Sequence, residues 1–221
     1  EEVLQRRAAQ EQAEKTNEDK NMLLAYLSHE IRNPLAVIMG TLELATTQSN
    51  PKRQKHHMEV LRVASHGLAT LLDDVLDYTS MQRGHLQVRQ ERVDLVQILD
   101  DLVRLYQPQA ERLGLDLSFD YSNPSVVLGD RARIRQVLYN LVSNALKYTR
   151  EGSIQLTLTT NEETIQVSVQ DTGPGILPEV RSQIFQPYER GQTADIPGTG
   201  LGLALSWELV KRMNSELFMD Q

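Results

Sequence analysis

Apolar residues recur every three or four positions in the N-terminal part of the chain, which is the pattern of amphipathic helices. One helix is predicted from Met22 to about Thr47, and a second runs from the QSNP segment at 48–51 to about Gln82. Two helices joined by a short loop form an antiparallel hairpin, and a hairpin alone cannot enclose a core. Pairing two hairpins into a four-helix bundle is the usual solution. We therefore expect a homodimer.

The pattern changes after Gly84, where short alternating stretches predict strands and longer periodic stretches predict helices. The predicted strands are Leu86–Val93, Leu115–Tyr121, Ser153–Thr160, Thr164–Gln170 and Glu216–Met219, the third and fourth forming a hairpin. The predicted helices are near Leu95–Leu113, Arg131–Thr149 and Leu201–Met213. This mixture favours an α+β sandwich of one sheet and one helical layer.

Three segments are predicted along the chain. Residues 1–21 form a polar helical linker from a missing upstream region, with a frayed terminus as the alternative. Residues 22–85 form the helical hairpin, and residues 86–221 form the α+β domain, from which a closing strand is missing.

Composition excludes several kinds of chemistry. The 221 residues include no cysteine, so disulfides and thiolate sites are absent. All five histidines lie at or before His85, which excludes a histidine-based hydrolase or zinc site in the C-terminal part. The net charge of −7 and the lack of a Lys/Arg-rich block argue against nucleic acid as a partner. The longest run without a polar residue, Met22–Leu27, is too short to cross a bilayer.

One histidine lies on the unexpected face of its helix. In the segment SHEIRNPL, His29 is about 200° around the helix from the apolar residues Leu27 and Ile31. Asn33 shares its outward face, and Glu30 adjoins it. A neutral imidazole is a competent nucleophile near neutral pH, and a carboxylate can fix its tautomer. The other four histidines are interpreted as ordinary surface residues.

Polar residues also mark one face of the helix predicted at Arg131–Thr149. Asn140, Asn144 and Lys147 follow one another at spacings of four and three. Amide oxygens suit Mg²⁺, which keeps phosphates and waters in its shell, and the ammonium suits phosphate. A solvated polar face is the alternative.

Two glycine loops follow. The segment 171–176, DTGPGI, places an acceptor at a strand end beside two glycines, so the backbone can pass close to a ring. The segment 198–203, GTGLGL, leads into a helix, whose free N–H groups suit phosphate. It lacks the Lys-Ser/Thr of a Walker A loop and the last glycine of a Rossmann fingerprint. Each loop alone could be an ordinary turn.

Taken together, five segments resemble the H, N, G1, F and G2 boxes of sensor histidine kinases: SHEIRNPL, NLVSNALKY, DTGPGI, IFQPYER and GTGLGL. Five motifs in order, between about Met22 and Met213, are far more specific than any one of them. The resemblance implies a multidomain protein, with an all-α helical hairpin followed by an α+β two-layer ATPase domain of the Bergerat fold. Residues 22–85 would be the dimerisation and histidine phosphotransfer domain, and residues 86–221 the catalytic ATP-binding domain.

The resemblance also implies roles for individual residues. His29 would accept the γ-phosphoryl group of ATP, Glu30 would orient it as acid/base partner, and Asn33 would position water in a reverse, phosphatase reaction. Asn144 would coordinate Mg²⁺ with help from Asn140.

The other nucleotide contacts are implied in the same way. Lys147 would contact phosphate, Tyr148 would pack on the nucleotide, Asp171 would read the adenine amine, and Arg190 would approach the γ-phosphate. The remaining nucleotide-binding residues would be Gly173, Gly175, Ile176, Gly198, Thr199, Gly200, Leu201 and Gly202.

The implied partners are a second copy of the chain and the receiver domain of a response regulator, with ATP and Mg²⁺ bound and no nucleic acid. The resemblance also implies the cytoplasmic portion of a membrane-anchored sensor, with the anchor in a missing upstream segment. Two other functions stay open. One is a Bergerat-fold ATPase that drives conformational change, although Asn140 and Asn144 stand where a carboxylate base would be needed. The other is a degenerate kinase that serves as a dimeric docking module.

Overall fold

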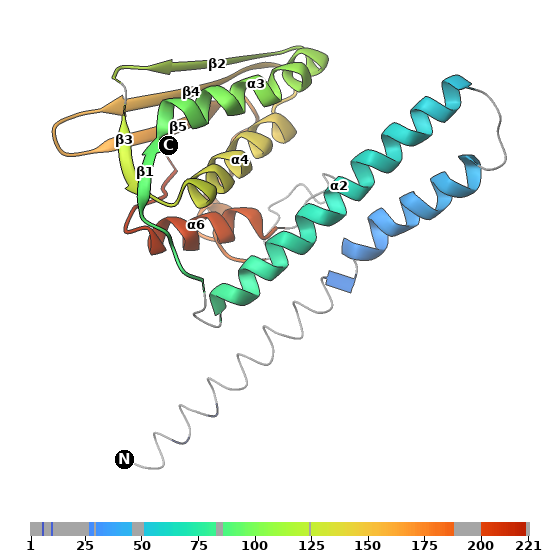
Figure 1. Cartoon of the computed structure of the whole chain (residues 1–221), viewed down its shortest axis with the longest axis horizontal. Coiled ribbons are helices and arrows are strands. Elements are labelled where there is room, and N and C mark those ends of the chain that lie inside the picture. The colour runs from blue at the N-terminus through green and yellow to red at the C-terminus, as the bar shows by residue number, and fades with distance from the viewer. Residues whose placement is uncertain are drawn as a thin grey trace. The chain divides into compact units, whose positions relative to one another are not determined.

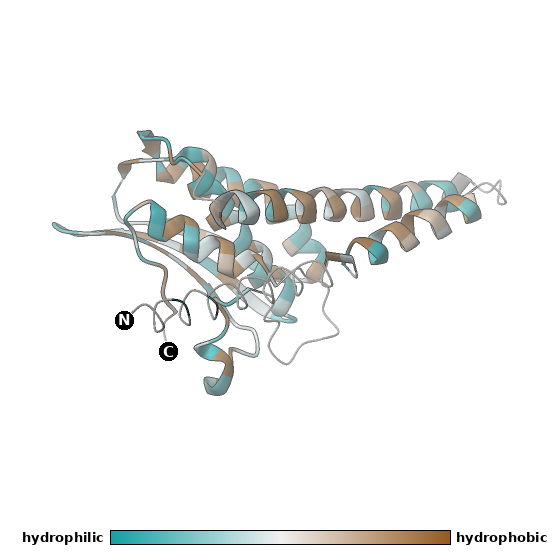
Figure 2. Ribbon diagram, turned by 90° about the horizontal axis from the view of Figure 1, so that it is seen from below, coloured by the Kyte–Doolittle hydropathy of each residue, from teal (hydrophilic) through white to brown (hydrophobic). Residues whose placement is uncertain are grey.

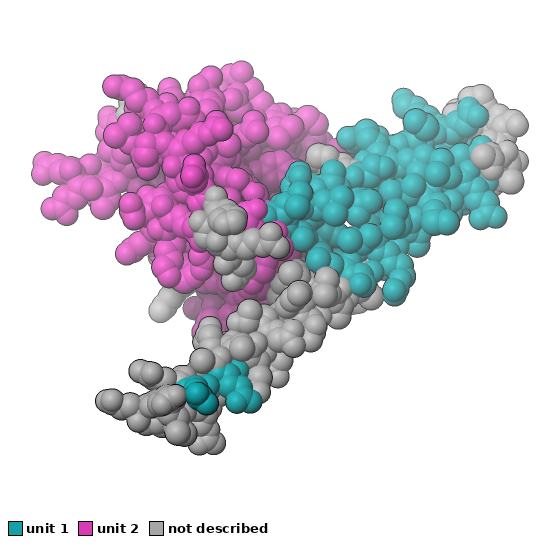
Figure 3. Space-filling view, turned by 60° about the horizontal axis from the view of Figure 1, so that its bottom comes forward, with its two compact units in different colours: residues 1–76 teal, residues 77–221 magenta. Residues whose placement is uncertain are grey.

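The computed structural model describes residues 6, 10, 27–28, 30–45, 51–82, 86–123, 125–187 and 200–219. The chain divides into two compact units, residues 1–76 and residues 77–221 (Figure 3). No helix among the described residues has the length and apolar character needed to span a bilayer.

The described residues of the first unit are helical. Residues 30–45 are helical, and α2 extends from Pro51 to Gln82, crossing into the second unit at Asp77. Both predicted helices are thereby confirmed over the residues that the structure describes. Figure 2 shows brown, apolar residues along both helices. Many of these side chains are exposed in the single chain: Leu35, Val37, Met39, Leu42, Leu44, Met58, Val63, Leu72 and Leu76.

The second unit contains the end of α2 followed by an α+β domain. Its strands are β1 (Glu91–Asp94), β2 (Leu115–Tyr121), β3 (Val126–Gly129), β4 (Gly152–Thr160) and β5 (Ile165–Asp171). Its helices are α3 (Leu95–Leu113), α4 (Arg131–Tyr148), α5 (Pro178–Arg181) and α6 (Gly202–Arg212). The helical N-terminal region followed by an α+β sheet domain confirms the predicted fold class.

The strands form two sheets among the described residues, whereas the sequence predicted one. In the larger sheet β4 is central, parallel to β2 and antiparallel to β5. The β4–β5 hairpin was predicted, and Asn161 closes it by accepting the backbone N–H groups of Glu163 and Thr164. In the smaller sheet β1 pairs antiparallel with β3.

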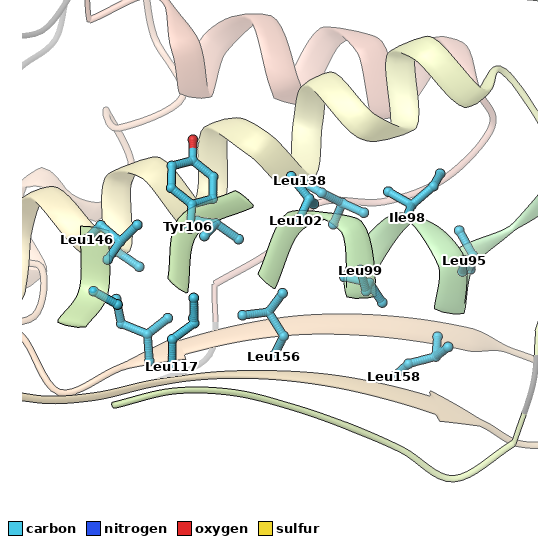
Figure 4. Packing of buried hydrophobic residues seen from close by; sticks show 14 of the residues in the cluster. Leu95, Ile98, Leu99, Leu102, Tyr106, Leu117, Leu138, Leu146, Leu156 and Leu158 are labelled. Atoms are coloured by element: carbon cyan, nitrogen blue, oxygen red, sulfur yellow. The ribbon is translucent and has the colours of Figure 1, made fainter. Parts of the chain in front are cut away.

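The main core lies between the larger sheet and helices α3 and α4, which cover one face of it (Figure 1). Ile154, Leu156 and Leu158 alternate along β4 and are fully buried, as expected for the inward face of a central strand. Side chains of both helices point toward Leu156 and Leu158 of β4 (Figure 4). The helical contribution comes from residues at helical spacing: Leu95, Ile98, Leu99 and Leu102 of α3, and Leu138, Val142 and Leu146 of α4.

A second apolar cluster, here called the three-helix cluster, joins α2, α4 and α6. Its buried members are Met81, Val137, Leu205, Leu209 and Val210. Because α4 contributes to both clusters, it is anchored on two sides. It is also fixed at its start by Asp130, whose Oδ1 accepts the N–H groups of Ala132 and Arg133 at 3.0 and 3.2 Å.

Four predictions of local structure were incomplete or wrong. The strand predicted at Leu86–Val93 begins only at Glu91, because Leu86 packs against the three-helix cluster instead. The strand predicted at Glu216–Met219 is wrong, since residues 215–219 have no regular structure and Leu217 joins the same cluster. The short β3 and α5 were not predicted.

Candidate functional site

The C-terminal half of α4 presents a polar face. Asn140, Asn144 and Lys147 lie at helical spacing of four and three residues, and all three are half-buried. The ammonium of Lys147 lies 4.8 Å from the centre of the Tyr148 ring. No described residue hydrogen-bonds to the amide of Asn144. This face therefore combines two amides, a cation and an aromatic ring.

A carboxylate adjoins the end of this helix. Thr149, which follows α4 and is buried, approaches Oδ1 of Asp171 with its hydroxyl at 3.5 Å. The backbone N–H of Gly173 donates to the same Oδ1 at 2.8 Å. Asp171 is exposed, and no described donor reaches its Oδ2. That oxygen is therefore oriented and available to accept an exocyclic amine.

The backbone after Asp171 is tightly packed. A Cβ at Gly173 would lie 2.6 Å from Asp171 Oδ1 and 3.3 Å from the carbonyl oxygen of Tyr148. Gly175 has a φ of +70°, in the left-handed region that favours glycine. Arg181 of α5 donates from Nε to the carbonyl of Ile176 at 3.1 Å. The loop predicted to pass close to a ring thus has a fixed shape.

Thr172 ties this loop to the start of β4. Its hydroxyl accepts the N–H of Ser153 at 3.0 Å and donates to the carbonyl of Glu151 at 3.0 Å. Its backbone N–H donates to the carbonyl of Ser153 at 3.1 Å. Gly152, with a φ of +101°, leaves room for this hydroxyl, because a Cβ there would overlap it.

The start of α6 lies against the same face of α4. Asn140 donates from Nδ2 to Oγ of Ser206 at 2.9 Å, and Ser206 is only 2% exposed. A Cβ at Gly202 would lie 2.9 Å from Cγ of Asn140 and closer still to its Oδ1. A side chain at this position would therefore displace the Asn140 amide.

The N-terminus of α6 carries the features of an anion site. Its N-cap residue, Leu201, offers no side-chain hydrogen bond, and no acidic residue lies in the first turn. The first N–H groups of a helix have no partners within it and favour negative charge. Leu201 is fully buried, and Gly200 has a φ of +62°. The start of α6 thus lies beside Asn140 of α4, with Gly202 next to the Asn140 side chain.

The structure therefore brings together two of the predicted loops on one helix. Asp171 and its loop meet α4 through Thr149, and Gly200–Gly202 meet it through Asn140. Glu30 is half-buried and Asn33 exposed in the helical residues 30–45. Four predicted site residues lie outside the described residues: His29, Arg190, Gly198 and Thr199.

Three residues that hold this arrangement in place were not predicted: Thr149, Thr172 and Ser206. Thr149 directly follows one predicted motif, Thr172 lies inside another, and Ser206 lies three residues after a third. The role of each depends on a partner distant in sequence. A buried hydroxyl normally has a partner, so the apolar surroundings of Ser206 on α6 were the available signal.

The surroundings of two side chains that pack against or cap α4, Tyr106 and Asp130, shift their pKa values. Burial raises the pKa of Tyr106 well above its ordinary value, and the neighbouring Tyr139 of α4 raises it further. Burial opposes ionisation of Asp130, but backbone N–H donors from Arg89, Arg133 and Ala132 together with the Arg133 charge prevail and lower its pKa. Tyr106 is thus a neutral phenol, and Asp130 a carboxylate.

Two protein families match this chain, one over its helical N-terminal part and one over its α+β part. Residues 19–84 match the His Kinase A (phospho-acceptor) domain, and residues 129–221 match the histidine kinase-, DNA gyrase B- and HSP90-like ATPase family. The second match supports ATP binding. The predicted domain boundary at residues 84–86 stays a prediction.

Individual relatives and solved structures that resemble this chain are also sensor proteins or histidine kinases. The chain is 36% identical to sensor protein TorS of Escherichia coli over 97% of its own length and 24% of TorS. It is 31% identical to the ArcB homolog of Haemophilus influenzae over 96% of its own length and 69% of that protein. Full-length ShkA, crystallised with AMPPNP, is 31% identical with a TM-score of 0.64, covering 86% of this chain and 41% of ShkA.

A further structure, histidine kinase ThkA in complex with the response regulator TrrA, is 26% identical with a TM-score of 0.65, covering 87% of this chain and 55% of ThkA. The chain spans about a quarter or less of the length of the first curated relatives that it matches, 24% of TorS and 18% of the virulence sensor BvgS of Bordetella parapertussis. From the two family matches and these relatives, the chain belongs to the sensor histidine kinases of two-component systems.

Proposed function

We propose that this chain is the kinase core of a two-component sensor, which binds ATP at α4 and transfers its γ-phosphoryl group to His29. The observation that carries the proposal is the meeting of two loops on one face of α4. The Thr149–Asp171 contact brings the first loop to the helix, and the Asn140–Ser206 hydrogen bond brings the second. A base-reading group and an anion-binding helix end are thereby attached to one rigid element.

In the proposed complex, Oδ2 of Asp171 accepts the adenine amine while Gly173 lets the ring approach the backbone. Lys147 and the N–H groups of Gly200 and Gly202 bind phosphate oxygens. Tyr148 packs on the nucleotide. Ile176 and Leu201 shape the two loops, and Gly175 provides the turn that the first loop needs.

The residues on α4 also fit a magnesium ion. No group of three His, Asp or Glu side chains that could hold a metal occurs among the described residues. Mg²⁺ in nucleotide sites is commonly held by few protein oxygens together with substrate phosphates and waters. We propose that the carbonyl oxygens of Asn144 and Asn140 hold it, because Nδ2 of Asn140 is committed to Ser206. Bound Mg²⁺ would neutralise phosphate charge.

In the transfer step, a ring nitrogen of His29 attacks the γ-phosphorus. A P–N bond forms as the P–O bond to ADP breaks, and Glu30 accepts the imidazole proton. Arg190 stabilises negative charge on the γ-phosphoryl oxygens, and Gly198 and Thr199 extend the phosphate contacts. The phosphoryl group then passes to an aspartate of a response-regulator receiver domain. Asn33 orients water when the reaction runs as a phosphatase on that partner.

We also propose that the active form is a homodimer. The first unit exposes many apolar side chains, among them Met39, Met58 and Leu76, and exposed apolar patches mark interaction surfaces. A second hairpin would cover them in a four-helix bundle. The upstream membrane anchor stays a prediction.

Incubation with Mg²⁺ and γ-labelled ATP tests the proposal. We expect protein-bound label that is labile in acid and stable in alkali, and its loss in His29→Gln. Asp171→Asn should lower labelling by weakening nucleotide binding. Phosphate release without protein labelling would indicate a conformational ATPase instead, and absence of ATP–Mg²⁺ binding would indicate a docking module.

A further inference from the structure

The C-terminal end of α2 is part of the ATPase unit. Residues from Asp77 onward belong to the second compact unit, and Met81 is a buried member of the three-helix cluster. Two sets of polar contacts accompany this packing. One reaches α4 and the other reaches α6, the two helices that carry the proposed phosphate and cation contacts.

The first set joins α2 to α4. Oδ2 of Asp77 accepts from Nη1 of Arg133 at 2.6 Å and from Nε2 of Gln136 at 2.8 Å. The same Nη1 of Arg133 donates to Oε1 of Gln136 at 2.8 Å, which closes the triangle. The side chains of Arg133 and Asp77 are only 24% and 20% exposed. This partial burial makes the ion pair more than a solvent-screened surface contact.

The second set joins α2 to α6. Nη2 of Arg212 donates to the carbonyl oxygen of Met81 at 2.9 Å. The last carbonyls of a helix lack partners and carry the negative end of its dipole, and α2 has no basic residue of its own in its last turn. Arg212, from the last turn of α6, supplies that missing cation.

These contacts lie on the face of α4 that carries the candidate site. Arg133, Gln136, Asn140 and Asn144 follow at spacings of three, four and four, so they share one side of the helix. The α2 end contacts α4 near its start, and α6 contacts it through Asn140 and the three-helix cluster. The three helices thus form one block, in which α2 bridges the other two.

We infer that Asp77, Arg133 and Gln136 are positioning residues for phosphate binding, because with Met81 and Arg212 they fix α6 relative to α4. A helix of the length of α6, 11 residues, is about 16 Å long, so a tilt of about 4° at its anchored end moves its N-terminus by about 1 Å. That N-terminus carries the Gly200–Gly202 N–H groups. Asp171 is held at the end of α4 through Thr149 and Gly173 and not through α6, so a tilt of α6 does not displace it. The inference rests on the proposed nucleotide site.

The test compares two ligands in the full chain. Asp77→Ala, Arg133→Ala and the double variant are measured by titration calorimetry with ATP–Mg²⁺ and with adenosine, together with thermal unfolding. We expect each single variant to bind ATP about tenfold more weakly, while adenosine affinity stays within about twofold. The double variant should lose no more than either single variant, because the two residues act through one contact.

Asp100→Asn is the matched control. It breaks the Arg104–Asp100 pair on α3, whose 2.7 Å distance is similar but whose side chains are 75% and 48% exposed. It should leave both affinities unchanged. If an alanine variant is too unstable, Asp77→Asn removes the charge while keeping the side-chain volume.

The outcomes separate the inference from the proposed function. Equal losses of ATP and adenosine affinity, or no loss of either, would show that the Asp77–Arg133 contact serves stability alone and would overturn the inference. A wild-type chain that binds neither ligand would refute the proposed nucleotide site itself.

Discussion

The contact between Gly202 and Asn140 allows a sharp test of how α6 meets α4. In Gly202→Ala the new Cβ would lie 2.9 Å from Cγ and 3.0 Å from Nδ2 of Asn140, and closer to Oδ1. Ordinary contact between non-bonded heavy atoms requires about 3.5 Å. The Asn140 amide must therefore swing away by about 1 Å, which breaks its 2.9 Å hydrogen bond to Ser206.

The energetic effect follows from burial. Ser206 is 2% exposed, so losing its partner costs about 1–3 kcal/mol. The advantage of alanine over glycine, about 0.5–1 kcal/mol in a helix interior, is smaller at Gly202, the first residue of α6. We expect Gly202→Ala to lower the free energy of unfolding by about 1–2 kcal/mol. Because Asn140 is also a proposed oxygen ligand, ATP–Mg²⁺ affinity should fall by about tenfold or more.

Chemical denaturation and calorimetric titration with ATP–Mg²⁺ measure both effects. Gly67→Ala is the matched control, since Gly67 lies within α2 and no atom lies within 4 Å of its Cβ position. It should leave ATP affinity unchanged and stabilise the helix by up to about 1 kcal/mol. Unchanged stability and ATP affinity in Gly202→Ala would refute this account of the α4–α6 contact.

Three further changes have defined outcomes. Asp130→Asn should destabilise the chain by about 1 kcal/mol in denaturant titrations at neutral pH, because the amide Nδ2 cannot accept the N–H of Arg89 that Oδ2 of Asp130 accepts at 3.0 Å. Since the folded-state pKa of Asp130 is lowered, the wild-type advantage should hold above the ordinary pKa of an aspartate and disappear as the pH falls through the folded-state value; an advantage that grows in acid would contradict this. Leu156→Ala should cost about 2–5 kcal/mol of unfolding free energy, and a loss below 1 kcal/mol would mean that the core collapses around the change. Gly173→Ala, whose Cβ would crowd Oδ1 of Asp171, should weaken adenosine binding measured by calorimetry, and undiminished binding would exclude the proposed base contact.

The local sequence was sufficient to predict a helix or strand where the element is long and buries side chains at regular spacing. The pattern of apolar residues predicted a helix at Leu95–Leu113 and a strand at Leu115–Tyr121, and α3 and β2 have these bounds. Gly114, with a φ of +71°, ends α3 and separates the two. Here the periodicity changes from helical to alternating at a glycine, so the signal is local.

The errors occur where pairing or packing depends on distant residues. β3, Val126–Gly129, has four residues and is defined by antiparallel pairing with β1. Leu86 and Leu217 lie in stretches with strand-like character, but both pack against the three-helix cluster. No strand pairs with either stretch in the part of the chain that the structure describes. The alternation of apolar and polar residues alone cannot distinguish a stretch that pairs as a strand from one that packs against helices without pairing.

The candidate site was predictable as a set of motifs but not as an assembly. Asn140 and Asp171 could be identified from their sequence neighbours. That Asn140 uses its amide to hold Ser206, and that Thr149 links α4 to Asp171, depends on contacts spanning 66 and 22 residues. The Asp77–Arg133 contact spans 56 residues and crosses the predicted domain boundary, so no local pattern indicated it.

The central claim is that ATP bound at α4 phosphorylates His29 and no other histidine. The chain offers four alternatives as acceptors: His56, His57, His66 and His85. Tandem mass spectrometry of chain incubated with ATP–Mg²⁺, digested and analysed near neutral pH, assigns the modified residue directly. We predict one phosphoryl group, on the peptide that contains His29. Gly202→Ala protein should give the same product in a strongly reduced amount. Phosphorylation at another histidine, or an unmodified His29 under conditions in which ATP is bound, would contradict the account.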